Sequence, residues 1–153
     1  MKLRNYRNKD DFNKLLNLIV EFEYDKQISF EKIKISRDKI YSTNKKNLTE
    51  FLNDKTYKYF ICEDENKMIG YAFASFDKTY NEGYINEVYI IPEKRLNGFG
   101  QKLVEKAIEW LNKKNCKTID LTVNIKNKSA ISLYKKFGFK NYKDEYITMR
   151  KNN

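Results

Sequence analysis

The sequence contains no histidine, only two cysteines and a single proline among its 153 residues. The absence of histidine excludes Ser-His-Asp and Cys-His nucleophilic sites and removes the commonest transition-metal ligand. Cys62 and Cys116 lie far apart, and neither belongs to a Cys-x-x-Cys pair, so the sequence has no basis for a zinc or dithiol site. We therefore expect two reduced thiols and no bound metal.

Segments that separate domains or direct a protein to a membrane are also lacking. The chain has no Gly/Ser-rich linker and no repeat at solenoid or propeller spacing, and 41% hydrophobic residues are enough for a real core. Residues 1–11 are charged from the start and lack the apolar core of a signal peptide, and no apolar run approaches a membrane span. We expect one domain over residues 1–153, a cytoplasmic location and no membrane partner.

The chain has an excess of positive charge, with 31 Lys and Arg against 21 Asp and Glu and a net charge of +10. A basic surface attracts nucleic acid and other anionic ligands. The abundant Lys, Asn, Ile, Tyr and Phe all have A/T-rich codons, so genome composition explains the same excess, and both explanations stay open. The sequence has no RNP motif, zinc knuckle or helix-turn-helix signal, so nucleic-acid binding would depend on charge alone.

Hydrophobic periodicity predicts a mixed α/β fold whose front half is mainly antiparallel. The expected strands cover residues 2–7, 57–63, 68–77, 84–91, 117–123 and 140–150. The expected helices cover residues 10–24, one or two segments within 30–54 with an interruption near Ser42, Thr43 and Asn44, then 99–114 and 127–137. An acidic turn at residues 64–67 joins two of the strands as a hairpin.

The most informative segment, residues 87–104, is predicted as a buried strand, a short basic turn with two glycines, and a helix. The N–H groups of such a turn and the dipole of the following helix favour a bound phosphate. A Walker loop is excluded because no Gly-Lys pair occurs, and a dinucleotide fingerprint would need a glycine at Leu103. The remaining pattern is Arg-x-x-Gly-x-Gly from Arg95 to Gly100, which is also compatible with glycines that only permit close helix–strand packing.

A second motif follows further along the chain. Asn127 predicts an N-cap, Gly138 predicts a helix end, and Tyr134 lies on the short helix between them. A strand, Arg-x-x-Gly-x-Gly, a long helix, a strand and Asn-x-x-Ala-x-x-x-Tyr-x-x-x-Gly-Phe, in this order, resemble the GNAT superfamily of acetyl-coenzyme A-dependent N-acetyltransferases. The resemblance is strong from Met68 to Met149, and the N-terminal third fits only through its pattern of elements.

The resemblance implies a fold and a cofactor site. A mostly antiparallel sheet, flanked by helices, would have splayed fourth and fifth strands, here residues 84–91 and 117–123, with the pantetheine arm of acetyl-CoA in the gap. Backbone N–H groups of residues 96–101 would hold the pyrophosphate, Arg95 would supply charge, and the Ile90 N–H would face the thioester oxygen. The family usually has a small residue, often Gly, where this chain has Leu96. The cofactor-binding residues expected from the resemblance are Val88, Tyr89, Ile90, Arg95, Leu96, Asn97, Gly98, Phe99, Gly100, Gln101 and Asn127.

The resemblance also implies the reaction, a direct transfer of acetyl from acetyl-CoA to a primary amine of a small molecule or peptide in a ternary complex. Tyr134 resembles the general acid, although an aromatic packed on its helix is the alternative. Glu87 is the expected base, acting through water, while Asn86 is an amide where the family often has a carboxylate. Neighbouring strand residues face opposite sides unless a bulge intervenes, so the direction of Glu87 stays open. Tyr80, Tyr84 or water are the alternatives to Glu87.

The acceptor and partners are less constrained. Glu21, Glu23 and Asp25, interleaved with aromatic residues, would suit either a cationic acceptor or an ordinary exposed helix face. A homodimer through the C-terminal strands is implied only by relatives. Two other functions stay open: a non-enzymatic, basic nucleic-acid-binding module, and a cofactor-binding domain that has lost catalysis, which Asn86 and Leu96 make conceivable.

Overall fold

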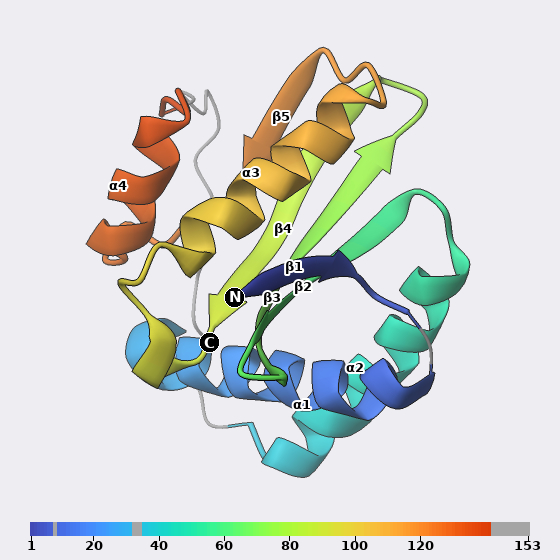
Figure 1. Cartoon of the computed structure of the whole chain (residues 1–153), viewed down its shortest axis with the longest axis vertical. Coiled ribbons are helices and arrows are strands. Elements are labelled where there is room, and N and C mark those ends of the chain that lie inside the picture. The colour runs from blue at the N-terminus through green and yellow to red at the C-terminus, as the bar shows by residue number, and fades with distance from the viewer. Residues whose placement is uncertain (8, 32–34, 142–153) are drawn as a thin grey trace, which may run out of the picture. The chain divides into compact units, whose positions relative to one another are not determined.

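The computed structural model describes residues 1–7, 9–31 and 35–141, without the side chains of residues 30 and 31 (Figure 1). The chain divides into two compact units, Met1–Thr122 and Val123–Asn153. The expectation of one domain over the whole chain stays a prediction.

The first unit is built on a five-stranded sheet with strand order β1-β2-β3-β4-β5. All neighbours are antiparallel except β4 and β5, which are parallel, so the predicted mixed and mostly antiparallel sheet is confirmed. The strands are β1 (Lys2–Asn5), β2 (Tyr57–Asp64), β3 (Lys67–Asp77), β4 (Glu82–Ile90) and β5 (Thr118–Leu121).

The pairing of β4 with β5 is short. It runs only from Glu82 opposite Thr118 to Ile85 opposite Leu121, whereas β4 continues to Ile90. Within the described part of the chain, residues 86–90 therefore have a strand on the β3 side alone. This is the expected splay of the fourth and fifth strands.

The hairpin between β2 and β3 closes at Glu65 and Asn66. Both residues have positive φ, 49° and 61°, which is the conformation of a two-residue turn that matches the twist of antiparallel strands. The acidic turn predicted at residues 64–67 is confirmed in place and role.

Three helices cover the sheet: α1 (Lys9–Lys26), α2 (Arg37–Asn53) and α3 (Phe99–Asn112). A π-helical turn, Gln27–Glu31, follows α1, and a short 3₁₀ turn, Pro92–Lys94, follows β4. Tyr59 and Ile61 of β2 belong to the core beneath α1 and α2, while the intervening Phe60 contacts Trp110 of α3. Since successive strand residues face opposite sides, α3 covers the face opposite to α1 and α2.

The predicted interruption within α2 is wrong. The Ser42 hydroxyl donates to the Lys39 carbonyl at 3.1 Å, and the Asn44 amide donates to the Ile40 carbonyl at 2.9 Å. These polar side chains bond back to carbonyls of their own helix instead of ending it. The helix starts instead at Ser36, whose hydroxyl accepts from the Lys39 N–H as an N-cap.

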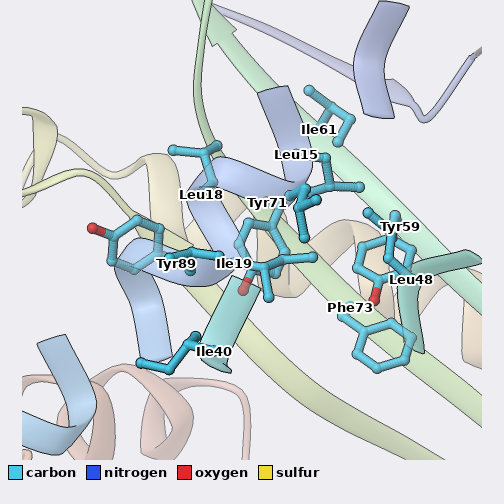
Figure 2. Packing of buried hydrophobic residues seen from close by; sticks show 12 residues of the cluster. Leu15, Leu18, Ile19, Ile40, Leu48, Tyr59, Ile61, Tyr71, Phe73 and Tyr89 are labelled. Atoms are coloured by element: carbon cyan, nitrogen blue, oxygen red, sulfur yellow. The ribbon is translucent and has the colours of Figure 1, made fainter. Parts of the chain in front are cut away.

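The core beneath α1 and α2 is rich in aromatic rings (Figure 2). Tyr59 and Phe73 stack with centroids 4.4 Å apart and planes 5° from parallel, and Tyr71 is completely buried. Such rings bury large apolar areas and hold their neighbours in defined positions. The side chains of β4 that lie on the face covered by α1 and α2 are therefore packed against well-ordered neighbours.

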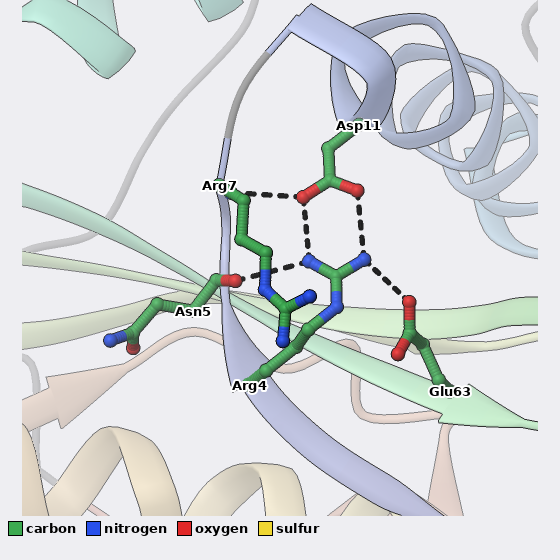
Figure 3. Close-up of polar contacts among 5 residues, drawn as sticks. All are labelled: Arg4, Asn5, Arg7, Asp11 and Glu63. Carbon is green, nitrogen blue, oxygen red and sulfur yellow. Dashed lines mark hydrogen bonds and ion pairs between the residues drawn. The ribbon is translucent and has the colours of Figure 1, made fainter. Parts of the chain in front are cut away.

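A partly buried ionic network joins the start of the chain to the rest of the first unit (Figure 3). The Arg4 guanidinium donates twice to Asp11 at 2.6 and 2.7 Å and also donates to Glu63. The Arg7 N–H donates to the same Asp11 carboxylate at 2.9 Å. The network ties β1 to the first turn of α1 and to the end of β2.

The second unit contains α4 (Lys128–Lys136), which begins after Asn127 and is followed by Gly138 at a φ of 84°. The predicted cap and helix end are thereby confirmed. The strand expected over residues 140–150 lies, from residue 142 onward, outside the described residues. Across the residues described, no helix combines the length and apolar character that a membrane span requires.

Candidate active site

The glycine turn between β4 and α3 has a backbone that few residues adopt. Leu96 has a φ of 64° and Gly98 a φ of 77°, both in the left-handed region. The Asn97 side-chain amide donates to the carbonyls of Lys94, at 3.4 Å, and Arg95, at 3.1 Å, and so closes the turn on itself. A Cβ at Gly98 would meet no atom within 4 Å, so glycine is needed there for its backbone conformation rather than for space.

This turn presents N–H groups without protein partners. Among the described hydrogen bonds, none is donated by the backbone N–H groups of residues 96–101. The next backbone N–H along the chain that donates is that of Lys102, to the Gly98 carbonyl at 3.2 Å. Gly98 has no side chain to cap α3, and Leu96 is 97% exposed. Free N–H groups at the positive end of a helix dipole suit an anion such as a pyrophosphate.

Among the described residues, the edge of β4 that β5 leaves unpaired adds further donors. The Ile91 N–H donates to the Ile69 carbonyl at 3.0 Å, so it points toward β3. Because N–H groups alternate between the two edges of a strand, those of Val88 and Ile90 point away from β3, to the edge that β5 leaves unpaired. Tyr89, between them, turns its buried ring to the α1 face and donates its hydroxyl to Asp25 at 3.3 Å.

Arg95 makes several contacts within the protein. Its Nε donates to the Ile90 carbonyl at 2.9 Å, and its terminal nitrogen donates to Asp25 at 3.1 Å. The guanidinium carbon also lies 5.5 Å from the centroid of the Tyr89 ring. The structure thus places Arg95 as a link between the end of β4, the turn and α1, and its expected charge contact with a phosphate stays a prediction.

A β-bulge settles the direction of Glu87. Phe73 of β3 is opposite Glu87, and the next residue, Ala74, is opposite Ile85, which leaves Asn86 as the extra residue. Glu87 accepts a hydrogen bond from the Tyr71 hydroxyl at 2.7 Å, so its carboxylate lies on the face covered by α1. Asn86 donates to Ser75 of β3 at 2.9 Å, on the same face as Phe73 and Tyr71.

The carboxyl group of Glu87 has an unusual acidity. Burial raises its pKa from 4.5 to about 7, the hydrogen bond from Tyr71 and the charge of Lys26 oppose this, and Glu23 adds to it. Burial also raises the pKa of Tyr71 well above 10, so its phenol stays protonated and donates to the carboxylate. Near neutral pH, Glu87 can therefore both take up and release a proton.

An open cavity of about 340 Å³ lies beside Tyr84, near the start of β4. Ser75, which binds Asn86, and Tyr84 both line it. The Tyr84 hydroxyl donates to Glu82 at 2.6 Å, and this hydrogen bond is the main cause that raises its pKa to about 12, while Tyr80 is 66% exposed. The other lining residues are Thr56, Tyr57, Phe76, Asp77 and Lys78.

The acidic residues at the end of α1 all have basic neighbours. Glu21 pairs with Arg37 at 3.0 Å, Glu23 with Lys26 at 3.6 Å and Asp25 with Arg95 at 3.1 Å. Each of the three carboxylates therefore has a basic partner within the protein, and no cationic acceptor is needed to explain their presence. The link from Asp25 to the turn had no signal in the sequence, because only the tertiary fold brings residues 25 and 95 together.

The second motif lies in the second unit. The Asn127 side chain accepts from the Ala130 N–H at 3.2 Å and from the Ser129 hydroxyl at 3.1 Å, which makes it the N-cap of α4. Tyr134 packs edge-on against Phe139, with centroids 6.0 Å apart, and burial raises its pKa above 10. The cofactor contact of Asn127 and the acid role of Tyr134 stay predictions.

Comparisons with known proteins agree with this geometry. A family model described as "Acetyltransferase (GNAT) family" matches residues 19–139. An uncharacterized N-acetyltransferase of Methanocaldococcus jannaschii is 33% identical over 86 residues, 53% of this chain and 38% of that protein. Human N-alpha-acetyltransferase 30 is 32% identical over 106 residues, 61% of this chain and 29% of that protein. The chain thus spans well under half the length of these two relatives.

Solved structures share the fold. A predicted acetyltransferase from Clostridium acetobutylicum, solved with acetyl-CoA, superposes with a TM-score of 0.75 at 22% identity and covers 97% of this chain and 95% of that one. The family model extends from α1 through β4, the glycine turn and α3 to the end of α4. The predicted resemblance is confirmed: the chain belongs to the GNAT family of acetyltransferases.

Proposed function

We propose that the protein is an N-acetyltransferase that transfers an acetyl group from acetyl-CoA to a primary amine by direct attack within a ternary complex. The observation that carries this proposal is the juxtaposition of two sets of free backbone donors. The N–H groups of residues 96–101 surround the start of α3, and those of Val88 and Ile90 line the adjoining edge of β4, which has no partner among the described residues. The GNAT family uses acetyl-CoA, whose phosphates and amides need such donors.

The backbone donors of the glycine turn and of β4 fit the chemical groups of acetyl-CoA. The turn N–H groups would bind the pyrophosphate, and the β4 edge would bind the amides of the pantetheine arm. The N–H of Ile90 would stabilise negative charge on the thioester oxygen, because it is already oriented when that charge develops. Acetyl-CoA itself supplies an activated acetyl thioester.

Glu87 is proposed as the general base. An amine must lose a proton to form the amide product, and a carboxylate with a pKa near 7 accepts that proton at neutral pH. Tyr71 holds the carboxylate in place through its 2.7 Å hydrogen bond. Tyr84 is a weaker candidate, since its phenol has a pKa of about 12 and is protonated at neutral pH.

Tyr134 is proposed as the general acid on the strength of its motif. The sulfur that leaves needs a proton, and a phenol whose pKa is raised by burial still carries one at neutral pH. The phenolate would then be reprotonated from solvent, and Glu87 would release its proton to solvent. In each turnover Glu87 would take one proton and Tyr134 would give one, so the protein ends with its starting charge.

The acceptor is proposed to be a primary amine of a small molecule or peptide. The open cavity is lined by Tyr84 of β4, the strand that also carries the proposed base, and mixes aromatic and charged side chains. The name of the human relative, N-alpha-acetyltransferase 30, supports the inclusion of peptide amino termini among the acceptors to be screened.

Thermal unfolding with and without acetyl-CoA tests the proposal. A ligand that binds only the native state raises the unfolding midpoint when its concentration far exceeds Kd, so we expect a clear rise for the wild type. Gly98→Leu places a side chain in the turn and is expected to reduce the rise. Gly138→Leu is the matched control, since Gly138 also has a positive φ and open space around a Cβ, but lies beyond α4.

A rise should be followed by a thiol-release assay over a panel of amines, with peptides included. Release that depends on the amine would support the transfer. Binding without turnover across the panel would favour a cofactor-binding domain that has lost catalysis. The absence of any shift at saturating acetyl-CoA would overturn the proposal, and salt-dependent nucleic-acid binding would be measured next.

A further inference from the structure

We propose that Asp25 is a positioning residue for the cofactor turn, and that it acts through Arg95. The inference rests on the proposed cofactor site and assigns to α1 a role in building it. Asp25 lies in the last turn of α1, far from the turn in sequence, and was expected either to bind a cationic acceptor or to lie on an exposed helix face.

The contacts of Asp25 converge on one carboxylate oxygen. Its Oδ2 accepts from the Arg95 guanidinium at 3.1 Å and from the Tyr89 hydroxyl at 3.3 Å. Arg95 in turn donates its Nε to the Ile90 carbonyl at 2.9 Å and lies over the Tyr89 ring. One carboxylate therefore connects the end of α1, the end of β4 and the first residue of the Arg-x-x-Gly-x-Gly motif.

The turn needs such support. Leu96, directly after Arg95, has a positive φ that costs an ordinary residue energy, and it is almost fully exposed. A turn with a strained and exposed residue binds best when its N–H groups are already oriented, because ordering them on binding reduces affinity. Asp25 fixes Arg95, and Arg95 fixes the point at which the turn leaves β4.

The expected effect on stability is small. The side chains of Asp25 and Arg95 are 38% and 47% exposed, and ion pairs of that exposure contribute little to folding. A change in cofactor affinity upon substitution can therefore be separated from a loss of folding.

The sign of the effect distinguishes positioning from simple electrostatics. A carboxylate near an anion site repels the anion, so its removal should tighten binding if charge alone matters. If Asp25 positions the turn, its removal should weaken binding instead.

The experiment is an isothermal titration calorimetry measurement of the Kd for coenzyme A with the wild type, Asp25→Ala and Asp25→Asn. We expect Asp25→Ala to raise Kd about fivefold to twentyfold. Asp25→Asn keeps an oxygen for Arg95, so it should retain most of the affinity. Glu21→Ala is the matched control: it removes a carboxylate one helical turn earlier, whose partner is Arg37 and not the turn, and should leave Kd unchanged or slightly lower.

The route through Arg95 is tested by a double-mutant cycle. If Asp25 acts through Arg95, the Asp25→Ala change should have no further effect on Kd in an Arg95→Ala background. Equal or tighter coenzyme A binding by Asp25→Ala would overturn the inference while leaving the proposed function intact. Failure of the wild type to bind coenzyme A would overturn both.

Discussion

The carboxyl group of Glu87 should make stability depend on pH in an unusual direction. The unfolded group ionises around its ordinary pKa of 4.5, whereas burial raises the pKa of the folded group to about 7. The contribution of Glu87 to the free energy of unfolding is therefore fully present below pH 4.5. It falls as the pH rises from 4.5 to 7 and stays at the lower level above pH 7. Glu87→Gln removes this loss, so the difference in the free energy of unfolding between the variant and the wild type should shift in favour of the variant by about 3 kcal/mol from pH 4 to pH 8.

Urea unfolding at pH 4, 6 and 8 measures this difference. Tyr71→Phe is a useful companion, because it removes the hydrogen bond that lowers the pKa of Glu87 and should extend the fall in stability above pH 7. An equal effect of Glu87→Gln at all three pH values would show that the carboxyl group titrates normally and would weaken its assignment as the base.

Substitutions at Leu96 and Gly98 should have opposite effects on the free energy of unfolding. Both have positive φ, and only Gly98 tolerates it without strain. We expect Leu96→Gly to change the free energy of unfolding by between 0 and about 1 kcal/mol in the stabilising direction, because relief of strain is partly offset by the entropy of glycine in the unfolded chain. Gly98→Ala should destabilise by about 1 kcal/mol.

Denaturant unfolding of both variants in one buffer gives the comparison. A Cβ at Gly98 would touch nothing within 4 Å, so any loss there reports backbone strain alone. If Leu96→Gly destabilised as much as Gly98→Ala, the left-handed conformation of Leu96 would be contradicted.

At the scale of elements, the Arg4 network holds β1 and α1 to the rest of the sheet. Asp11 is 4% exposed. Asp11→Ala would leave the Arg4 guanidinium with Glu63 as its remaining carboxylate partner, and should lower the free energy of unfolding by about 2 to 4 kcal/mol. Hydrogen bonds from Arg4 lower the pKa of both Asp11 and Glu63, so the stabilisation is present above their ordinary pKa values and is lost as the pH falls through the lowered ones.

Chemical unfolding between pH 3 and pH 7 checks both parts of this expectation. Arg4→Met should flatten the acid side of the stability curve, because both carboxylates lose their hydrogen bonds from Arg4. The control is Arg37→Met, which removes an exposed pair with Glu21 and should cost no more than about 1 kcal/mol. Similar losses for the two arginine variants would contradict the distinction between a buried and an exposed pair.

Elements with strong local signals were predictable from the sequence, and those decided by distant contacts were not. The hairpin at residues 64–67 and the cap at Asn127 depend on local backbone chemistry, and both were found as predicted. The interruption of α2 was predicted wrongly, because Ser42 and Asn44 have the same local preference for caps whether or not the helix continues. The bulge at Asn86 depends on registry with β3, which no property of β4 alone reveals.

At the scale of the whole molecule, the same distinction applies to the site. The glycine turn and its place before α3 follow from the order of residues 87–104, and the family was recognisable from two motifs. The partners of those residues, Tyr71 for Glu87 and Asp25 for Arg95, come from other elements and required the tertiary structure. The predicted cytoplasmic location and the homodimer through the C-terminal strands stay predictions.

The net charge of +10 is consistent with the proposed ligand. Coenzyme A carries a pyrophosphate and a 3′-phosphate, and a positive field raises its rate of encounter with the turn. Several carboxylates near the turn and α1 are paired with arginine or lysine, and each such pair adds little net charge to this field.

The short pairing of β4 with β5 has a consequence for the protein without its ligand. Within the described ranges, the last residues of β4 present an unpaired edge, and such edges are templates on which other chains assemble. A pantetheine arm bound along that edge would act as a surrogate strand. The same ligand that brings the acetyl group would then also serve as protection against aggregation, and the cell's supply of coenzyme A would help to keep this protein dispersed.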